Sequence, residues 1–160
     1  MLTIALSLLL GLPAAARTPD AAVAAVLDDW HAAAAKPDEE RYFAHFAPDA
    51  VFIGTDAWER WDLEAFREYA HKRFVTGKGW TLVPSDRHVS FSPDGKTAWF
   101  DEAVTSQSYG LSRGSGVLVR SGDRWLIAQY NLSVPIPNDL LLNFAGIIKA
   151  WKEKGAPPRP

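Results

Sequence analysis

The sequence predicts an α+β fold in which helices and strands occupy separate stretches of the chain. Three helical patterns interrupted by one short strand come first, four strands joined by short turns follow, and one more helical pattern comes last. Helices collected apart from an antiparallel sheet are typical of α+β domains. Because a long twisted sheet has one face to bury, we expect it to curve around the N-terminal helices and to enclose a cavity.

The helices are expected where capping residues precede apolar residues at helical spacing. Thr18 and Pro19 supply an N-cap hydroxyl and a proline at the first helical position. Asp62 and Asn138 are the corresponding caps of the third and the last helix. The four expected helices cover residues 18–36, 38–47, 62–76 and 138–154.

The sheet is expected to begin with a short apolar strand at residues 50–54. Further along, the Ser-Pro-Asp-Gly run at residues 92–95 is a strong turn signal, and a Ser-Gly-Asp turn follows at residues 121–123. Strands joined by short turns at this spacing form an antiparallel meander. Its four strands are expected at residues 81–92, 97–106, 113–120 and 124–134.

The composition limits the classes of function. The chain has 160 residues, of which 48% are hydrophobic and 22% charged, which is enough for one globular domain. Its net charge of −2 offers no basic excess to neutralise phosphates, so we expect no nucleic-acid partner. The absence of cysteine excludes disulfides, thiolate nucleophiles and thiolate metal sites.

The N-terminus predicts export. Residues 1–16 carry no charge, are largely apolar and end in three alanines, as a secretory signal does before its cleavage site. Cleavage after Ala16 would make the protein periplasmic or secreted, with no stable membrane insertion afterwards. A retained anchor and a buried helix of the domain are the alternatives. The remaining chain divides into a domain at residues 17–137, an amphipathic helix at 138–154 and a tail at 155–160.

Residues that match a known family occur in five segments, at 43–56, 92–95, 98–102, 114–118 and 125–133. These segments resemble the SnoaL-like domain proteins of the nuclear transport factor 2-like (NTF2-like) superfamily. Many relatives carry W-x-I-x-H-x-H-x-S in the last strand, where this chain has Gln129 and Asn131 in place of the two histidines. The resemblance implies a cone in which a curved antiparallel sheet wraps around the N-terminal helices, with a C-terminal helix added. Because Gln129 and Asn131 replace them, this chain does not share any acid–base role that those histidines have in the relatives.

The same resemblance implies that one side of the last strand faces the cavity. Gln129, Asn131 and Ser133 alternate along the strand and would then point inward together. Inward polar groups need hydrogen-bond partners, which a polar ligand can supply. The alternative is that the Tyr130 side is buried and the polar row is solvated.

Asp101 is the candidate catalytic residue, because the resemblance places Trp99 and Asp101 inside the cone. A carboxylate desolvated among aromatic rings has a raised pKa, which suits a general acid or base near neutral pH. Arg113 is a candidate for binding an anionic group of a ligand. The alternative is that Asp101 and Arg113 form a structural ion pair across the meander.

Thr55 and Trp58 are candidate ligand contacts in the loop after the first strand, which we expect at the mouth of the cavity. The alternative is a turn that leads to the Asp62 cap, with the tryptophan packed on the sheet. A single E-x-x-H pair, Glu68 and His71, falls short of the two motifs that a di-iron site needs. We therefore expect neither a metal nor a cofactor.

Three functions remain open, because this superfamily contains both enzymes and binding domains. The first is binding of a small, partly apolar molecule in the cavity. The second is an isomerase, dehydratase or cyclase reaction in the same cavity, with Asp101 as acid or base. The third is a non-catalytic dimerisation or protein-interaction module. A homodimer is expected, and the last helix either packs over the sheet or forms a dimer contact.

Overall fold

The structure is a computed structural model that describes residues 19–155, so the predicted signal segment at residues 1–16 lies outside the described residues. The helical elements are α1 (Pro19–Ala35), α2 (Glu39–Phe43), α3 (Leu63–Phe74), the 3-10 turn η1 (Asn138–Leu140) and α4 (Leu141–Glu153). The strands are β1 (Phe46–Ile53), β2 (Arg60–Asp62), β3 (Val83–Phe91), β4 (Thr97–Ser106), β5 (Gly110–Ser121) and β6 (Arg124–Ser133). The α+β class is confirmed.

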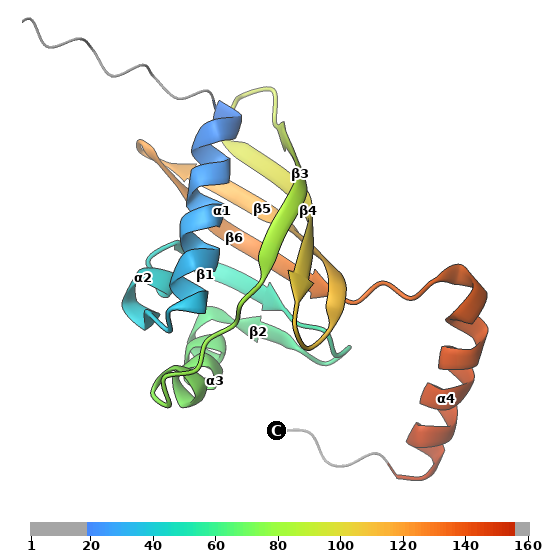
Figure 1. The fold of residues 1–160 in the computed structure, drawn as a ribbon. Helices are drawn as coiled ribbons and strands as arrows, with labels where there is room; N and C mark the ends of the chain where they lie inside the picture. The colour runs from blue at the N-terminus through green and yellow to red at the C-terminus, as the bar shows by residue number, and fades with distance from the viewer. Residues whose placement is uncertain (1–18, 156–160) are drawn as a thin grey trace, which may run out of the picture.

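The strands form one curved six-stranded sheet in the order β2-β1-β6-β5-β4-β3 (Figure 1). The four strands predicted as a meander are present and antiparallel to one another. The curved sheet is mixed rather than purely antiparallel, because β1 pairs with β6 in parallel. The three-residue β2, which pairs antiparallel with β1, was too short to leave a pattern in the sequence.

Helix α1 lies across the concave side of the sheet and closes the cone (Figure 1). Its inward residues Val23, Leu27 and Trp30 are at most 2% exposed, as expected for the apolar stripe of a helix that packs on a sheet. They meet Phe100, Ile127 and other side chains of the inner face of the sheet in one hydrophobic core. The cone therefore has a packed narrow part, and the site lies where this packing ends.

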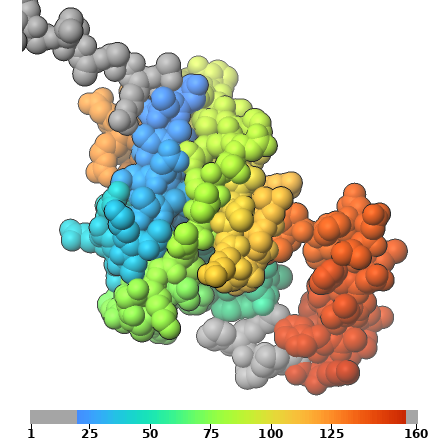
Figure 2. Space-filling view, in the orientation of Figure 1, coloured from blue at the N-terminus to red at the C-terminus, as the bar shows by residue number. Residues whose placement is uncertain are grey.

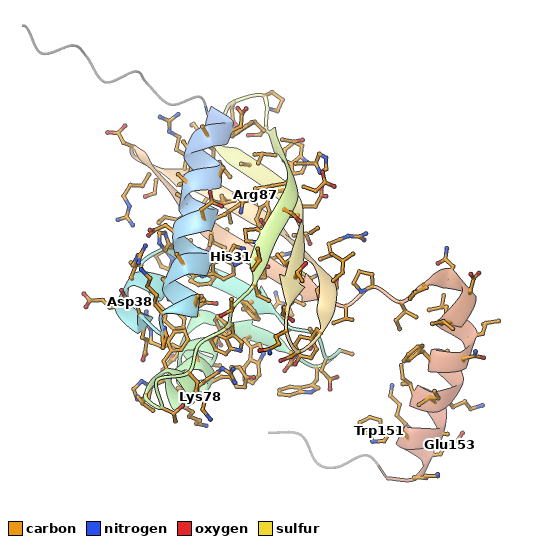
Figure 3. All side chains as sticks on the ribbon, in the orientation of Figure 1. His31, Asp38, Lys78, Arg87, Trp151 and Glu153 are labelled. Carbon is orange, nitrogen blue, oxygen red and sulfur yellow. The ribbon has the colours of Figure 1, made fainter. Side chains whose placement is uncertain are left out.

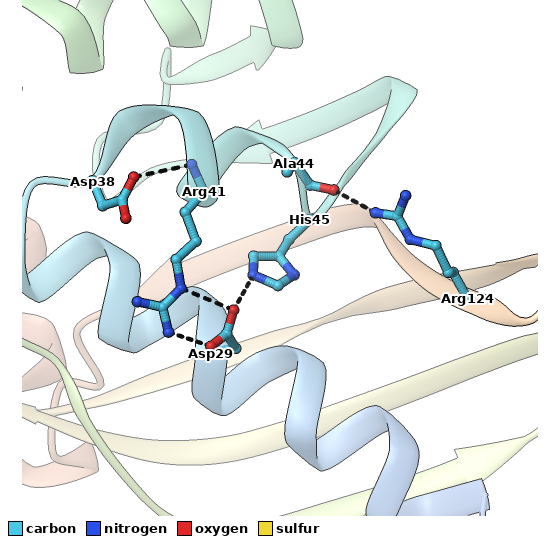
Figure 4. A network of polar contacts seen from close by, with 6 residues as sticks. All are labelled: Asp29, Asp38, Arg41, Ala44, His45 and Arg124. Atoms are coloured by element: carbon cyan, nitrogen blue, oxygen red, sulfur yellow. Dashed lines mark hydrogen bonds and ion pairs between the residues drawn. The ribbon is translucent and has the colours of Figure 1, made fainter.

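A charged cluster fastens α1 to the α2–β1 corner (Figure 4). Asp29 on α1 accepts hydrogen bonds from both Nε and Nη2 of Arg41 and lies 2.9 Å from Nε2 of His45. Arg124 of β6 donates to the Ala44 carbonyl at 3.0 Å. The Arg41 hydrogen bonds lower the pKa of Asp29 to about 2, so the cluster stays charged at neutral pH.

Two bulges reverse the alternation of side chains along their strands. In β6 the register shifts between the pairs Val117–Gln129 and Leu118–Ile127, which leaves Ala128 as an extra residue. Trp125 and Ile127 before the bulge are buried, and so is Tyr130 after it. In β3 a second shift between Ser85 and His88 includes Asp86, whose φ of 48° is left-handed.

Helix α4 stands apart from the cone (Figures 1 and 2). A linker at residues 134–137 separates it from β6, and every residue of α4 is exposed. Of the two arrangements considered for this helix, packing over the sheet is not the one observed, because its apolar side chains remain exposed. Among residues 19–155, no helix is long and apolar enough to cross a bilayer.

Candidate functional site

A cavity of about 270 Å³ opens between α1, α3 and the wide end of the sheet. Four segments form its mouth: the loop after β1, the outer side of α3, the chain leading into β3, and the β4–β5 turn. The mouth residues include Thr55, Glu59, Tyr69, Arg73 and Tyr109. The size suits a small organic molecule rather than a polymer.

Aromatic rings form most of the wall. Trp61 stacks on Tyr69 with ring centroids 5.3 Å apart, and Tyr69 stacks on Trp80 at 6.3 Å. Deeper in, Phe52 stacks on Phe66 at 3.9 Å, with only 9° between the ring planes. Near-parallel rings on the wall of a cavity favour a flat apolar ligand.

A buried ionic group lies at the inner end of the cavity, where His31 of α1 forms part of the lining. His31 Nε2 lies 2.7 Å from Oε1 of Glu102, and Arg87 Nε donates to Oε2 of the same carboxylate at 2.7 Å. Arg87 also donates to the Ala24 carbonyl and pairs with Asp28 on α1. Figure 3 shows His31 and Arg87 between α1 and the sheet.

Glu102 is ionised despite being only 1% exposed. Burial raises its pKa, but the hydrogen bond with His31 and the charge of Arg87 outweigh burial and hold the pKa below its usual value. An ionised carboxylate only accepts hydrogen bonds, so the proton of this contact belongs to His31 Nε2. In a neutral imidazole, Nδ1 is then the nitrogen with the free lone pair.

Tyr130 adds a second polar group at this end. Its ring lies 4.5 Å from that of Trp30, and its hydroxyl is buried without a hydrogen-bond partner among the described residues. Burial and the charge of Glu102 raise the pKa of Tyr130, so the hydroxyl stays protonated. Gly114 makes room for it, since a Cβ there would lie 2.4 Å from the Tyr130 oxygen and 3.1 Å from Glu102 Oε1.

Asp101 and Trp99 face away from this site, contrary to the expectation from the sequence. Their side chains lie on the outer face of β4, where Trp99 is 48% and the Asp101 side chain 61% exposed. The inner face of β4 carries the other alternate set, Phe100 and Glu102, instead. Asp101 contacts His88 at 3.5 Å and lies opposite Ser115, so the considered pair with Arg113 is not the contact it makes.

The polar row of β6 also points outward, because the bulge at Ala128 moves Tyr130 to the inner face. Gln129, Asn131 and Ser133 are half-buried outside the cavity. Their expected inward orientation is wrong, and the alternative with the Tyr130 side buried is the observed arrangement. Exposed Arg113 shares that outer face, across from Ser133 in the register.

The two loop residues have different positions. Thr55 lines the mouth of the cavity, as expected from the sequence. Trp58 does not line the cavity and instead packs edge-on against Trp61, with ring centroids 5.1 Å apart. Of the eight residues predicted to contact a ligand, Thr55 alone lines this cavity.

The sequence reasoning missed His31, Glu102 and Tyr130 as site residues. A signal for His31 was present, since it follows Trp30 and lies four residues after Leu27 on the apolar side of its helix. Glu102 likewise continues the alternation of Ala98 and Phe100, whose side of β4 is buried. No group of three potential metal ligands occurs within residues 19–155.

This architecture, a curved sheet closed by an N-terminal helix around an aromatic cavity, defines an NTF2-like α+β cone. A family profile described as SnoaL-like domain matches residues 23–137, so the chain belongs to the SnoaL-like domain family. The chain matches none of the curated proteins with which it was compared.

Solved structures agree on the fold. An NTF2-like protein of unknown function from Pseudomonas putida KT2440 is 15% identical, with a TM-score of 0.62 over 73% of this chain and 87% of the other. A proposed dehydratase of the NTF2-like family from Streptomyces avermitilis is 16% identical, with a TM-score of 0.63 over 75% of this chain and 100% of the other. A protein from Nostoc punctiforme PCC 73102, described as cystatin-like in fold and of unknown function, is 16% identical, with a TM-score of 0.58 over 71% and 89%. At these identities the likeness shows the fold alone.

Proposed function

We propose that the domain binds a small, flat, largely apolar molecule that carries one polar group. The observation that supports this most is the composition of the cavity, whose walls are aromatic and whose lining includes His31 and Tyr130, the latter with a buried hydroxyl that has no partner among the described residues. A buried hydroxyl without a partner costs free energy unless something hydrogen-bonds to it. A ligand that packs against the aromatic wall and directs a carbonyl or hydroxyl oxygen toward Tyr130 would supply that bond.

The experiment compares 2-naphthol with naphthalene as probes, by ligand-observed NMR titration of the chain. We expect 2-naphthol to bind and Tyr130→Phe to weaken it about three- to tenfold, the effect of one neutral hydrogen bond. Naphthalene binding should not change, because it has no polar group. Gln129→Ala, on the outer face of the same strand, is the matched control and should leave both affinities unchanged. Failure of both probes to bind, or equal losses in the two variants, would contradict the proposal.

A second candidate function, proton transfer to or from the bound molecule, is favoured by the His31–Glu102 pair. An ionised carboxylate that holds Nε2 fixes the imidazole tautomer and leaves Nδ1 as a base. An enolisable ketone bound beside His31 would lose an α-proton to this nitrogen. Asp101 has no part in this reaction, because its side chain is on the other face of the sheet.

Exchange of the α-protons of 2-tetralone for deuterium tests this second function. The wild-type chain should speed the exchange above the buffer rate, and His31→Gln should remove that increase while 2-naphthol still binds. An unchanged exchange rate in His31→Gln would exclude His31 as the base. Binding without any exchange would leave the domain as a binding protein.

We also propose that the protein is exported, on the evidence of the uncharged apolar run and alanines in residues 1–16. N-terminal sequencing of the chain recovered from a bacterial periplasm should begin at Arg17. A cytoplasmic chain that begins at Met1 would exclude this proposal.

A further inference from the structure

We propose that α4 docks on an anionic lipid surface and lies in the plane of the membrane interface, with its apolar side toward the acyl chains. Four large side chains lie within a helical arc of roughly 120°, at about 100° per residue, and each is between 42% and 62% exposed. They are Leu141, Phe144, Ile147 and Ile148. Trp151 falls in the same arc, but it already makes another interaction and is not counted among the open positions. An exposed apolar patch of this kind marks an interaction surface.

The charged residues of the helix are placed around this arc as they are in helices that lie on membranes. Lys152 and the C-cap residue Lys154 lie just outside its two edges, by about 20° each. Glu153, the one acidic residue of the segment 141–154, lies about 180° from the middle of the arc. Lysines at the borders can keep their stems along the apolar side and extend their amines to lipid phosphates. The carboxylate on the far side stays in water.

The helix also has a charge of opposite sign to the chain as a whole. Residues 141–154 contain three lysines and one glutamate, whereas the net charge of the complete chain is −2. The third lysine, Lys149, lies on the polar side. An anionic bilayer attracts such a segment and offers an apolar layer directly beneath its negative charges. This order of groups matches the order in which α4 presents its lysines and its apolar arc.

The length of α4 suits a position on a bilayer rather than across one. Its 13 residues extend over about 20 Å, whereas the hydrocarbon core of a bilayer is about 30 Å thick. Only the apolar side of a helix that lies in the interface needs to leave the water. The binding is therefore peripheral and does not require the domain to be inserted.

The connection to the cone leaves the arc accessible. Figure 2 shows α4 standing away from the cone, and every one of its residues is exposed. Ile148 and Lys152 border a space of about 820 Å³ that separates them from the loop at residues 55–58. Thr55 of this loop also lines the mouth of the cavity. The four linker residues, 134–137, extend over about 14 Å at most, so a docked α4 holds the cone next to the bilayer.

Titration of the labelled full chain with lipid vesicles tests the docking. The chain has no cysteine, so Ile148→Cys carries an environment-sensitive fluorophore at a single position within the arc. Its emission should shift to the blue with vesicles of phosphatidylglycerol and phosphatidylcholine in equal parts. With phosphatidylcholine alone the partition coefficient should be at least about tenfold lower, because the lysines lose their partners. The same label on Leu142→Cys, which is 85% exposed in the wild type and lies outside the arc, should stay in water.

Two serine variants test the apolar side, each with the label at Ile148→Cys. Phe144→Ser removes a large side chain from the arc and should lower the partition coefficient about tenfold or more. Leu142→Ser also removes an apolar side chain from α4, but outside the arc, and should change the coefficient by no more than about twofold. Because the label reports on α4 itself, binding of vesicles by any other segment would leave its signal unchanged.

Two double variants test the charge. Lys152→Gln/Lys154→Gln should lower the partition coefficient about tenfold or more, since each lysine near an anionic surface contributes about 1 kcal/mol. Lys78→Gln/Lys96→Gln removes the same charge from the exposed surface of the cone and should change it by no more than about twofold. Equal losses in the two double variants would show that net charge, rather than α4, directs the binding, and would overturn the proposal.

Other occupants of the arc give different results. No response of the Ile148 label to either kind of vesicle, or an equal response to both, would overturn the proposal. Analytical ultracentrifugation without vesicles completes the test. A dimer in which the label is shielded would indicate a second copy, and a monomer in which it is shielded would indicate closure onto its own domain. Either result would overturn the proposal.

Discussion

The inner and outer faces of β4 carry the same pair of chemical groups with opposite consequences. On the inner face, Glu102 meets His31 at 2.7 Å and both side chains are at most 5% exposed. On the outer face, the neighbouring Asp101 meets His88 at 3.5 Å, and both side chains are more than 60% exposed. Burial, rather than residue type, decides which pair is costly to break and able to act on a ligand.

The largest effect is expected from removing the inner carboxylate. Glu102→Gln leaves Arg87 and His31 without their shared anion in the core and should lower the free energy of unfolding by about 3–5 kcal/mol. Asp101→Asn is the matched control on the outer face and should change it by no more than about 0.5 kcal/mol. Urea unfolding at pH 7 measures both. Similar losses in the two variants would remove the contrast between the faces.

A smaller effect is expected from adding one methyl group next to the same carboxylate. Gly114→Ala places a carbon against the Tyr130 hydroxyl and should cost about 1–3 kcal/mol by overpacking. Adding Tyr130→Phe removes the clashing oxygen and should restore most of the stability. Ser115→Ala, one residue along and on the outer face, should have little effect. A double variant as unstable as Gly114→Ala would show that another contact causes the loss.

The pH dependence of the free energy of unfolding should separate the buried carboxylate of Glu102 from the exposed carboxylates of the outer face. Because the folded pKa of Glu102 lies below its ordinary value of 4.5, the unfolded chain binds more protons in this range. The stability that Glu102 contributes is present above pH 4.5 and is lost as the pH falls through the folded pKa. Unfolding titrations below pH 5 should therefore be steeper for the wild type than for Glu102→Gln. Asp29, whose pKa is about 2, titrates in both proteins and does not account for the difference.

The fold could be predicted because its signals are local. The caps at Asp62 and the turn at residues 92–95 act within a few residues, and both are in place in the structure. The wrapping of the sheet around α1 was predicted only through the resemblance to the SnoaL-like domain proteins, because no local pattern specifies it. The parallel pairing of β1 with β6 could not be predicted, since it depends on residues far apart in the sequence.

The site could not be predicted because it depends on which face of each strand is buried. Strict alternation along β6 predicts the inward side chains correctly only as far as Ile127. At Ala128 the bulge adds one residue, so Tyr130 rather than Gln129 points inward. β4 alternates regularly up to Glu102, but its buried side carries Phe100 and Glu102 rather than Trp99 and Asp101, which the family resemblance placed inside the cone. A bulky aromatic residue is a poor guide to orientation when it is 48% exposed, as here.

The pairing of β1 with β6 has a consequence for how the chain folds as it is synthesised. Arg124 at the start of β6 donates to the Ala44 carbonyl, 80 residues earlier, and Ile127 donates to the carbonyl of His45. Contacts between such distant residues slow folding, because a long loop must be closed before they can form. During synthesis on the ribosome, β1 cannot pair with β6 until almost the entire domain has emerged. During that interval Phe52 and the edge of β1 are exposed to chaperones and to other nascent chains.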